Sequence, residues 1–356
     1  MTPGIALLLA FAGWPSAREP RYSIEVLPTP PDCESFSLEH GLTRQWVVGM
    51  VACLDSPGFR AVRWSHEGVI DLGTFGGPSS YPYAVDVRGR VVGAAETPDY
   101  YGNGNDHETR PFLWSDGALQ ELPTLGGHIG SGLALGPRGE IVGACQAGFD
   151  PAIGREPMRA CVWADGAVRD LGDLGGPDAW AYDINARGWI AGSSGIGAPP
   201  AEHAFLVDDA GMHDLGTLGG PASIPFALND RGDVVGFSAV PPPPQQRGTY
   251  HAFLWHEGRM HDLGTLNGTA WSQARDVNNR GEVVGTAFGG TGSEAVLWDA
   301  SGIHRLADLV PDSADWAFQT ATSIDDSGRI LVTARRAGRY NAVVLVPGGR
   351  PPEVED

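Results

Sequence analysis

The sequence lacks helical periodicity. No window of about 12 residues keeps apolar side chains at i, i+3 and i+4, so the pattern excludes a protein built from amphipathic helices. In their place are short β-branched runs bounded by Gly, Asn and Asp, such as Val234-Val235-Gly236. This pattern predicts an all-β fold.

Basic charge is scarce. The 356 residues include 24 Lys and Arg against 43 Asp and Glu, a formal net charge of −19. Binding to nucleic acid depends on Lys and Arg that contact phosphate, so this balance excludes nucleic acid as a partner. It also argues against binding to an anionic membrane surface. We interpret the acidic excess as a means of keeping an exported protein soluble.

Long hydrophobic runs are absent. The apolar stretch at residues 5–11 is too short to span a bilayer, and no later segment is longer. Because small residues follow it at Ser16 and Ala17, it is similar to an export signal, although no Lys or Arg precedes it. We therefore expect a signal peptide over residues 1–17, no membrane span, and a disordered tail over residues 348–356.

Familiar catalytic and metal-binding motifs are missing. The sequence contains no HExxH, GxSxG, P-loop or EF-hand pattern. Three histidines precede the predicted outer strands of successive repeats, His213, His261 and His304. Such positions are too far apart for one ion with ligand bonds of about 2 Å. We therefore expect no metal, no cofactor and no catalytic residue.

What the sequence does contain is a repeat. Its clearest copy reads HAFLWHEGRMHDLGTL over residues 251–266, followed by ARDVNNRGEVVG over residues 274–285. Seven copies run through the chain, and the Gly that ends the VVG-like run returns at intervals of 44 to 50 residues. These glycines are Gly49, Gly93, Gly143, Gly192, Gly236 and Gly285.

Each copy contains four strand-like segments. Turns such as Asp116-Gly117 join them, and Gly accepts the positive φ that a tight hairpin turn requires. Seven four-stranded units of this length predict a seven-bladed β-propeller over residues 22–347. The last copy is one strand short and the first has a spare strand at residues 22–27, which we expect to pair beside residues 341–346. An open β-solenoid is the alternative, but it does not explain this complementarity of the two ends.

Four cysteines fit export into an oxidising compartment. Cys145 leaves the second strand of its repeat and Cys161 enters the antiparallel third strand, so these two are expected to meet. Cys33, in the connection before the first repeat's inner strand, lies on the same face as Cys53. We predict two disulfides, Cys33–Cys53 and Cys145–Cys161.

The repeat motifs resemble those of a known family. HAFLW, DLGTLGG and the xNxxGxVVG run are similar to the motifs of HAF repeat-containing proteins, which are extracellular repeat proteins of bacteria. The resemblance covers about residues 22–346. It implies an extracellular or cell-surface location, with the periplasm as the alternative, and it implies neither a defined activity nor catalytic residues.

The loops between the second and third strands vary most, and function often resides on such loops over a rigid scaffold. In a propeller they share one face with the connections between repeats. The candidates for ligand contact on this face are Tyr81, Tyr100, Tyr101, His107, Trp180, Tyr250 and Trp271. Tyr81, Trp180 and Trp271, with Phe318, are candidates for an aromatic rim at the channel mouth, for which packing between blades is the alternative.

Polar residues also recur on the predicted inner strands. Asp86, Asp183, Asn229 and Asp276 each follow a recurring Ala by two residues. They are expected either to cap turns or to ring one end of the channel around a cation or waters.

These observations lead to one functional hypothesis and one alternative. The first is a monomeric, secreted or cell-surface module, without catalytic activity, that binds a protein, peptide or glycan through the face with the long loops. The alternative is a propeller enzyme, a lyase or glycoside hydrolase acting at the channel mouth. Such enzymes need paired carboxylates or a histidine base near the channel, and the predicted rim contains neither.

Overall fold

The structure is a computed structural model that describes residues 22–101, 106–197, 201–241, 249–266, 269–289, 292–311 and 313–348. The predicted signal peptide and residues 349–356 of the predicted tail lie outside these ranges. Apart from one short 3-10 helix, η1 (Leu306–Leu309), the regular elements in the described ranges are strands. The prediction of an all-β fold is confirmed.

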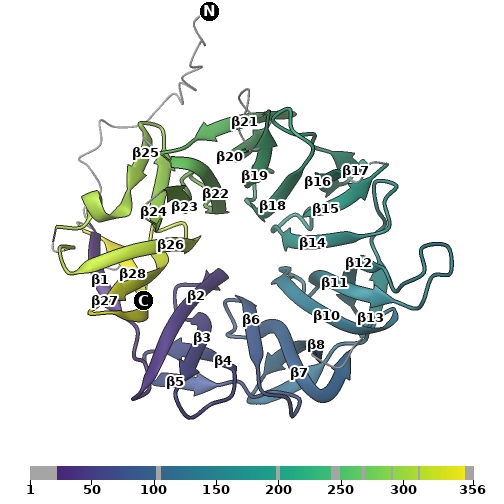
Figure 1. Ribbon diagram of the computed structural model, residues 1–356, viewed down its shortest axis with the longest axis horizontal. Coiled ribbons are helices and arrows are strands. Elements are labelled where there is room, and N and C mark those ends of the chain that lie inside the picture. Colours follow the sequence, from purple (N-terminus) through teal and green to yellow (C-terminus); the bar gives the residue numbers. More distant parts are fainter. Residues whose placement is uncertain are drawn as a thin grey trace, which may run out of the picture.

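The strands form seven four-stranded antiparallel sheets, which stand as blades around a central opening (Figure 1). This is the seven-bladed β-propeller that the repeat predicts. Each blade has an inner, a second, a third and an outer strand, and we number the blades 1 to 7 along the chain.

The strands have the following bounds. The inner strands of blades 1 to 7 are β2 (Cys33–Leu42), β6 (Ser80–Val85), β10 (Gly126–Leu135), β14 (Ala179–Ile184), β18 (Ser223–Leu228), β22 (Thr269–Val277) and β26 (Trp316–Ile324). The second strands are β3 (Val47–Cys53), β7 (Val91–Tyr101), β11 (Ile141–Ala147), β15 (Ile190–Ile196), β19 (Val234–Val240), β23 (Val283–Gly289) and β27 (Ile330–Arg336). The third strands are β4 (Phe59–Ser65), β8 (Asp106–Ser115), β12 (Met158–Ala164), β16 (Ala201–Asp208), β20 (Thr249–His256), β24 (Gly292–Asp299) and β28 (Arg339–Pro347). The outer strands are β5 (Gly68–Asp71), β9 (Ala118–Glu121), β13 (Ala167–Asp170), β17 (Gly211–Asp214), β21 (Arg259–Gly264), β25 (Gly302–Arg305) and, for blade 7, β1 (Tyr22–Val26).

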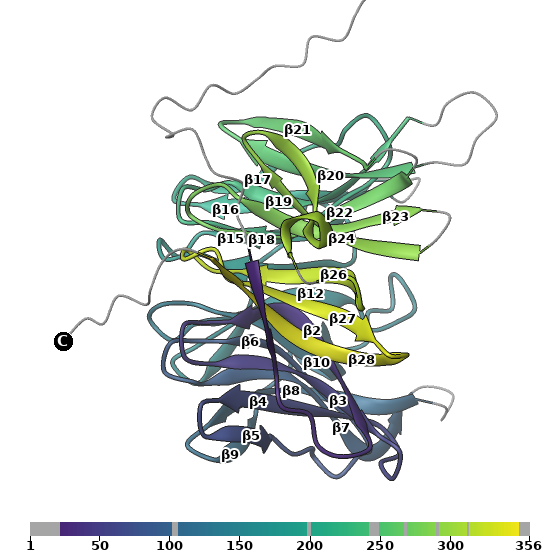
Figure 2. The same ribbon diagram turned by 90° about the vertical axis from the view of Figure 1, so that its left-hand side faces the viewer.

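The ring closes as expected. β1 lies antiparallel beside β28, with a register that runs from Tyr22 opposite Pro347 to Val26 opposite Val343 (Figure 2). The first strand of the chain therefore completes the last blade. Tyr22 is only 5% exposed and packs in the apolar cluster of blades 6 and 7, so the closure also buries a large side chain.

The recurring Gly marks a close approach between the inner and second strands. A Cβ on Gly93 would lie 2.1 Å from the carbonyl oxygen of Tyr81, and one on Gly143 would lie 2.0 Å from that of Ser131. Non-bonded atoms do not approach so closely, so any side chain here would push the inner strand away from its blade. This contact explains why the repeat keeps Gly at this position.

The recurring Trp fills the space between neighbouring blades. Trp64 of blade 1 is 1% exposed and packs with Leu331 and Val344 of blade 7. Its indole Nε1 donates a 2.7 Å hydrogen bond to the carbonyl oxygen of Pro28, just after β1. A large apolar ring with one polar group thereby stabilises the contact between two blades.

A bulge recurs in the inner strands of blades 2 to 7 and corrects one prediction. In blade 2 the register shifts between Pro82 and Ala84, and in blade 4 it shifts between Ala181 and Asp183. The recurring Ala therefore stands before the bulge in some blades and after it in others, so it is not one structural position. The four polar residues therefore do not form one ring, which was one of the two alternatives.

The four residues of that expected ring occupy two kinds of position. Asp86 and Asn229 begin the turn after the inner strand, and each accepts hydrogen bonds from backbone N–H groups two and four residues later. Asp183 and Asp276 lie inside their strands instead. Of the four residues, only Asp86 and Asn229 therefore cap turns, as the second alternative predicts.

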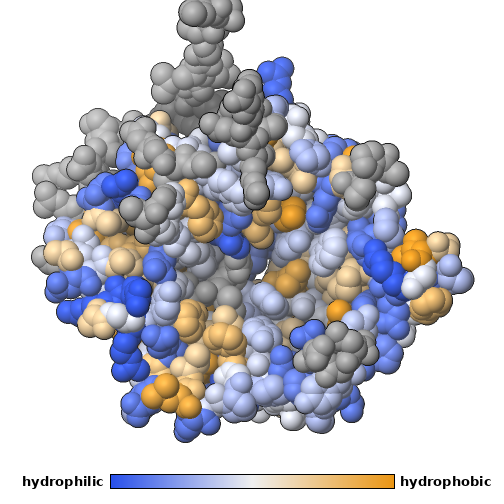
Figure 3. Space-filling view, in the orientation of Figure 1, coloured by the Kyte–Doolittle hydropathy of each residue, from blue (hydrophilic) through white to orange (hydrophobic). Residues whose placement is uncertain are grey.

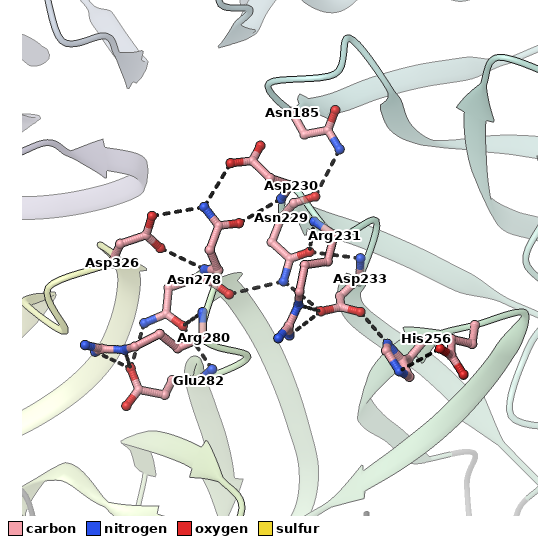
Figure 4. Close-up of polar contacts among 12 residues, drawn as sticks. Asn185, Asn229, Asp230, Arg231, Asp233, His256, Asn278, Arg280, Glu282 and Asp326 are labelled. Carbon is pink, nitrogen blue, oxygen red and sulfur yellow. Dashed lines mark hydrogen bonds and ion pairs between the residues drawn. The ribbon is translucent and has the colours of Figure 1, made fainter. Parts of the chain in front are cut away.

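The turns between inner and second strands are joined from blade to blade. The side-chain amide of Asn185 donates to the carbonyl oxygen of Asn229, and that of Asn229 donates to the carbonyl oxygen of Asn278, over 3.0 and 3.1 Å (Figure 4). The amide of Asn278 donates in turn to the carbonyl oxygen of Asp325 over 3.2 Å. This ladder links blades 4 to 7 on one face of the ring. We call it the turn face, and we call the opposite face the loop face, which carries connections such as residues 54–58 and 148–157.

Both predicted disulfides are present. Cys33 bonds to Cys53 and Cys145 bonds to Cys161, so each cysteine of the chain is paired. Cys33 is the first residue of β2, directly opposite Cys53 in β3, and so it belongs to the inner strand and not to the connection before it. The second disulfide joins the second and third strands of blade 3, at the base of a long connection on the loop face.

Candidate functional site

The histidines that the sequence places before the third strands lie inside β16 and β20, and they have a structural role. Nδ1 of His203 lies 2.9 Å from a carboxylate oxygen of Asp214, and His251 forms the same contact with Asp262 over 2.8 Å. Each Asp belongs to a DLG motif and also accepts a hydrogen bond from the following Gly N–H. Arg60 pairs in the same way with Asp71. The position of His203, His251 and Arg60 in the third strand is therefore filled by one half of an ion pair with the outer strand.

The loop face carries a pocket of about 400 Å³ between blades 2 and 3, which we call the loop pocket. It is lined by Tyr100, Tyr101, Glu108, His128, Phe149, Arg155 and Glu156. Its walls come from the ends of β7, β8 and β10 and from the connection between β11 and β12. That connection projects outward beside blade 3 (Figure 1) and bears apolar surface in the space-filling view (Figure 3). Phe149 and Ile153 are its exposed apolar side chains, at 65% and 39%.

The tyrosines are held by an unusually long hairpin. β7 and β8 extend beyond the length of the other second and third strands, and Tyr100 lies opposite His107 near their ends. The two rings stack at 4.4 Å between centroids. Tyr101 accepts a 2.9 Å hydrogen bond on its hydroxyl from Gln146 of blade 3. The structure therefore brings three sequence-predicted residues, Tyr100, Tyr101 and His107, to one site.

Two carboxylates face one histidine in this pocket. Nδ1 of His128 lies 2.9 Å from Glu108, and its Nε2 lies 3.8 Å from Oε1 of Glu156. Glu108 is 8% exposed and also accepts a 2.8 Å hydrogen bond from Arg110. Oε2 of Glu156 is buried, and no hydrogen-bond donor for it exists among the described residues.

Arg155 is neutralised within the pocket wall. Its guanidinium forms a bidentate pair with Asp178 of blade 4. These hydrogen bonds hold the pKa of Asp178 below its ordinary value and raise the pKa of Arg155. The pocket therefore presents aromatic faces and carboxylate oxygens, while its arginine is already occupied.

The remaining predicted residues lie elsewhere on the loop face. Tyr250 and Trp271 contact each other at 5.0 Å between ring centroids, and Trp271 is 41% exposed. Tyr81 approaches Phe59 at 6.3 Å in a separate aromatic group of blades 1 and 2. Phe318 is 4% exposed in the core.

The aromatic residues therefore fall into separate groups and do not form one continuous rim. Trp180 is half-buried on β14. The group that contains Tyr250 continues through Phe237 and Phe226 to Tyr182, at spacings of 5.5 to 6.0 Å. Burial raises the pKa of Tyr182 to about 12.

A second cluster lies at the centre of the ring, which is hollowed in the space-filling view (Figure 3). Inner strands of six blades line a cavity of about 210 Å³ there, and its polar side chains are His40, Asp183, Asp276 and Ser323. His40 belongs to an insertion that shifts the register of β2 between Ser37 and Leu42. Its Nε2 lies 3.0 Å from the carbonyl oxygen of Phe226, so it reaches across the channel to blade 5.

The two channel carboxylates join blades. Asp183 accepts hydrogen bonds from the N–H groups of Ile184 and of Leu228 in the next blade, at 2.8 and 2.7 Å. Asp276 does the same with Val277 and with Ile324 of blade 7. Burial raises the pKa of both carboxyls, and the nearby His40 opposes that shift.

Sequence reasoning missed part of each cluster. His128, Glu108 and Glu156 stand in positions that no motif marks. His40 had a detectable signal, because the segment from Ser37 to Leu42 interrupts the repeat of blade 1. In the part of the chain that the structure describes, no group of three or more His, Cys, Asp or Glu is arranged to hold a metal ion. The described residues also form no helix that is long and apolar enough to cross a membrane.

Known proteins resemble this chain in fold. No protein-family model and no curated protein sequence matches it. Among solved structures, an oligogalacturonate lyase in complex with manganese has a TM-score of 0.55 at 12% identity, over 93% of this chain and 97% of that one. A protein of unknown function from Dyadobacter fermentans has a TM-score of 0.45 at 12% identity, over 93% and 100%. A gluconolactonase from Xanthomonas campestris has a TM-score of 0.37 at 14% identity, over 93% and 95%. Identities this low show the fold alone, and the class of protein is a seven-bladed β-propeller.

Proposed function

We propose that this protein is an exported, monomeric binding module of the HAF repeat type, which holds a glycan in the loop pocket and performs no chemistry on it. The observation that carries the proposal is the composition of that pocket. Exposed aromatic rings of Tyr100 and Phe149 stand beside the carboxylates of Glu108 and Glu156 in a concave site of about 400 Å³.

This composition matches the chemistry of a sugar. A sugar ring presents C–H faces that pack on aromatic rings, and its hydroxyls donate hydrogen bonds to carboxylate oxygens. A concave pocket with a few convergent polar groups is typical of sites for small ligands or for one unit of a polymer. The hairpin of β7 and β8 and the disulfide between Cys145 and Cys161 support both walls, so little conformational entropy is lost on binding.

Separate observations support the proposed location. Two disulfides are typical of proteins that mature in an oxidising compartment, outside the cell or in the periplasm. The resemblance of the motifs to HAF repeat-containing proteins points the same way. The apolar segment at residues 5–11 supports an export signal.

The test is a glycan array followed by calorimetry on the best ligand. The double variant Tyr100→Ala/Tyr101→Ala is expected to weaken binding by about tenfold or more, because two stacking faces are lost. Its melting temperature should remain close to that of the wild type. The matched control is Trp271→Ala, which removes an exposed aromatic side chain from another group on the same face. Equal loss in both variants, or no glycan bound at all, would contradict the proposal.

A second candidate function is a lyase or glycoside hydrolase that acts in the channel. One observation favours it: His40, Asp183 and Asp276 converge on one cavity, and convergent titratable groups with shifted pKa values are typical of active sites. The oligogalacturonate lyase shares the fold. Against it stands the fact that each carboxylate already accepts backbone hydrogen bonds between blades. Release of unsaturated or reducing sugars from oligosaccharides, abolished by Asp276→Asn, would favour this candidate.

A further inference from the structure

The loop pocket contains one carboxylate oxygen without a partner. Oε2 of Glu156 is buried from solvent, and no described residue donates a hydrogen bond to it. A buried acceptor without a donor costs free energy, and such atoms in folded proteins usually receive a water, an ion or a ligand group. The oxygen belongs to a residue that lines the pocket. The Glu156 side chain is 20% exposed, and the terminal torsion of a glutamate is soft, so a small rotation of the carboxylate would present this oxygen to the pocket. A ligand in this pocket is therefore expected to bring a donor to Glu156.

The charge around Glu156 favours a cationic donor. Arg155 is occupied by Asp178, and Arg110 is occupied by Glu108. Among the described residues, the basic group that pairs with the Glu156 carboxylate is Nε2 of His128, 3.8 Å from Oε1, which leaves Oε2 unmatched. An ammonium group at this oxygen would form a charge-assisted hydrogen bond, which is stronger than the bond that a neutral hydroxyl forms.

The aromatic side chains of the loop pocket also favour a cationic group in the ligand. Tyr100 and Phe149 are 58% and 65% exposed, and both line the pocket together with Tyr101. The face of an aromatic ring attracts a cation, so these rings support an ammonium group as well as the ring of the sugar that carries it. An acidic sugar is disfavoured, because its carboxylate would face Glu108 and Glu156.

From these observations we infer that the ligand of the loop pocket is a glycan with free primary amino groups, of the glucosamine type, whose ammonium is held by Glu156. The inference rests on the proposed glycan binding and specifies the class of sugar. The net charge of −19 would in addition draw a cationic glycan toward the protein, and this part of the attraction falls with salt.

The test compares oligosaccharides of equal length by calorimetry at about pH 6, where the amine is protonated, and at about 150 mM salt. The probes are a glucosamine oligomer, its N-acetylated counterpart, an oligogalacturonate and a lysine oligomer of equal charge. We expect the glucosamine oligomer to bind about tenfold or more tightly than its N-acetylated form. Glu156→Gln should remove that preference, and Glu257→Gln, at an 87% exposed carboxylate of blade 5, should retain it.

Each other outcome has a distinct meaning. Equal binding of both glucosamine forms, lost in Tyr100→Ala, would overturn the amine inference and leave glycan binding intact. Absence of binding by every sugar would overturn the proposed function. Equal binding of the lysine oligomer would show attraction of charge alone and would overturn the inference.

A carbodiimide provides an independent readout, because it couples an amine to an adjacent carboxylate. The chain contains no lysine, so side-chain amines of the protein do not compete with the ligand. We expect the coupled sugar to map to Glu156 or Glu108 by mass spectrometry. Coupling spread over exposed acids, with neither glutamate modified, would overturn the inference.

Discussion

At the scale of single residues, the tryptophan between blades is expected to contribute strongly to stability, because it is large and almost fully buried. Trp64→Ala is expected to lower the free energy of unfolding by about 3–5 kcal/mol, because it leaves a cavity against Leu331 and Val344. Trp64→Phe keeps most of the apolar contact but leaves the carbonyl oxygen of Pro28 without its donor, at a cost of about 1–3 kcal/mol. Denaturant unfolding of both variants measures the two effects separately. A cost for Trp64→Phe as large as that for Trp64→Ala would contradict this division.

Asp233 supplies a prediction about pH. It is 2% exposed, and although burial opposes its charge, hydrogen bonds from His256, Asn229 and Arg231 hold its pKa below the ordinary value (Figure 4). A depressed pKa means that the folded state binds fewer protons than the unfolded chain. The stability from Asp233 is therefore present above the ordinary pKa of about 3.9 and is lost as the pH falls toward the folded pKa.

The variant Asp233→Asn tests this sign. Its deficit in unfolding free energy relative to the wild type is expected to be largest at about pH 5 and to shrink as the pH falls below about 4. Urea unfolding of both proteins between these values measures it. A deficit that grows on acidification would show that the pKa of Asp233 is raised and not depressed.

The sequence predicts some residues of the loop pocket and its hairpin but not others. Tyr100, Tyr101 and His107 were predictable because they lie in one long segment of blade 2 that departs from the repeat. Glu108 follows His107 in β8 without any motif to mark it, and His128 belongs to β10 of the next blade. Only the contact between blades 2 and 3 brings them within 2.9 Å.

At the scale of the strand pair, an ion pair joins the first part of the third strand to the end of the outer strand in blades 1 to 6. In blades 1 to 5 the outer strand supplies the acid, and in blade 6 the charges are exchanged, with Glu294 on β24 and Arg305 on β25, 3.0 Å apart. The exchange shows that the position requires opposite charges and not a particular residue. This explains why the sequence fills the slot with Arg, His or Glu.

Charge reversal in blade 6 tests this reading. Glu294→Arg alone should place like charges opposite Arg305 and cost about 0.5–1 kcal/mol. Adding Arg305→Glu should restore most of that stability, since it recreates the arrangement of blades 1 and 3. Thermal unfolding of the two single variants and the double variant forms the cycle. Additive losses in the double variant would mean that the two residues do not interact.

At the scale of the whole molecule, the closure of the ring is expected to contribute strongly to stability. Deleting residues 1–28 should lower the melting temperature sharply, because it exposes the edge of β28 and uncovers the cluster that Tyr22 completes. A control that begins at residue 22 keeps β1 and should melt like the longer chain. Equal melting of the two truncated proteins would show that β1 does not close the ring.

The sequence by itself determined the number of blades, the order of strands in each blade, the closing strand and both disulfides. These features follow from local patterns and spacing: a Gly where two strands touch, a turn dipeptide between apolar runs, and a spare strand matched by a missing one. Interactions between near neighbours in the chain produce such patterns, so the patterns can be recognised in the individual repeats.

Only the tertiary structure decided which side chains meet. Asp86 lies in the turn after its inner strand, whereas Asp183 lies inside its strand, because the bulge falls at a different point relative to the recurring Ala. The repeat alone does not reveal this difference in register. The curvature of the ring brought His40 across the channel and set Glu156 beside His128. Contacts of this kind join residues from different blades, and they depend on how blades pack and not on the pattern within any one of them.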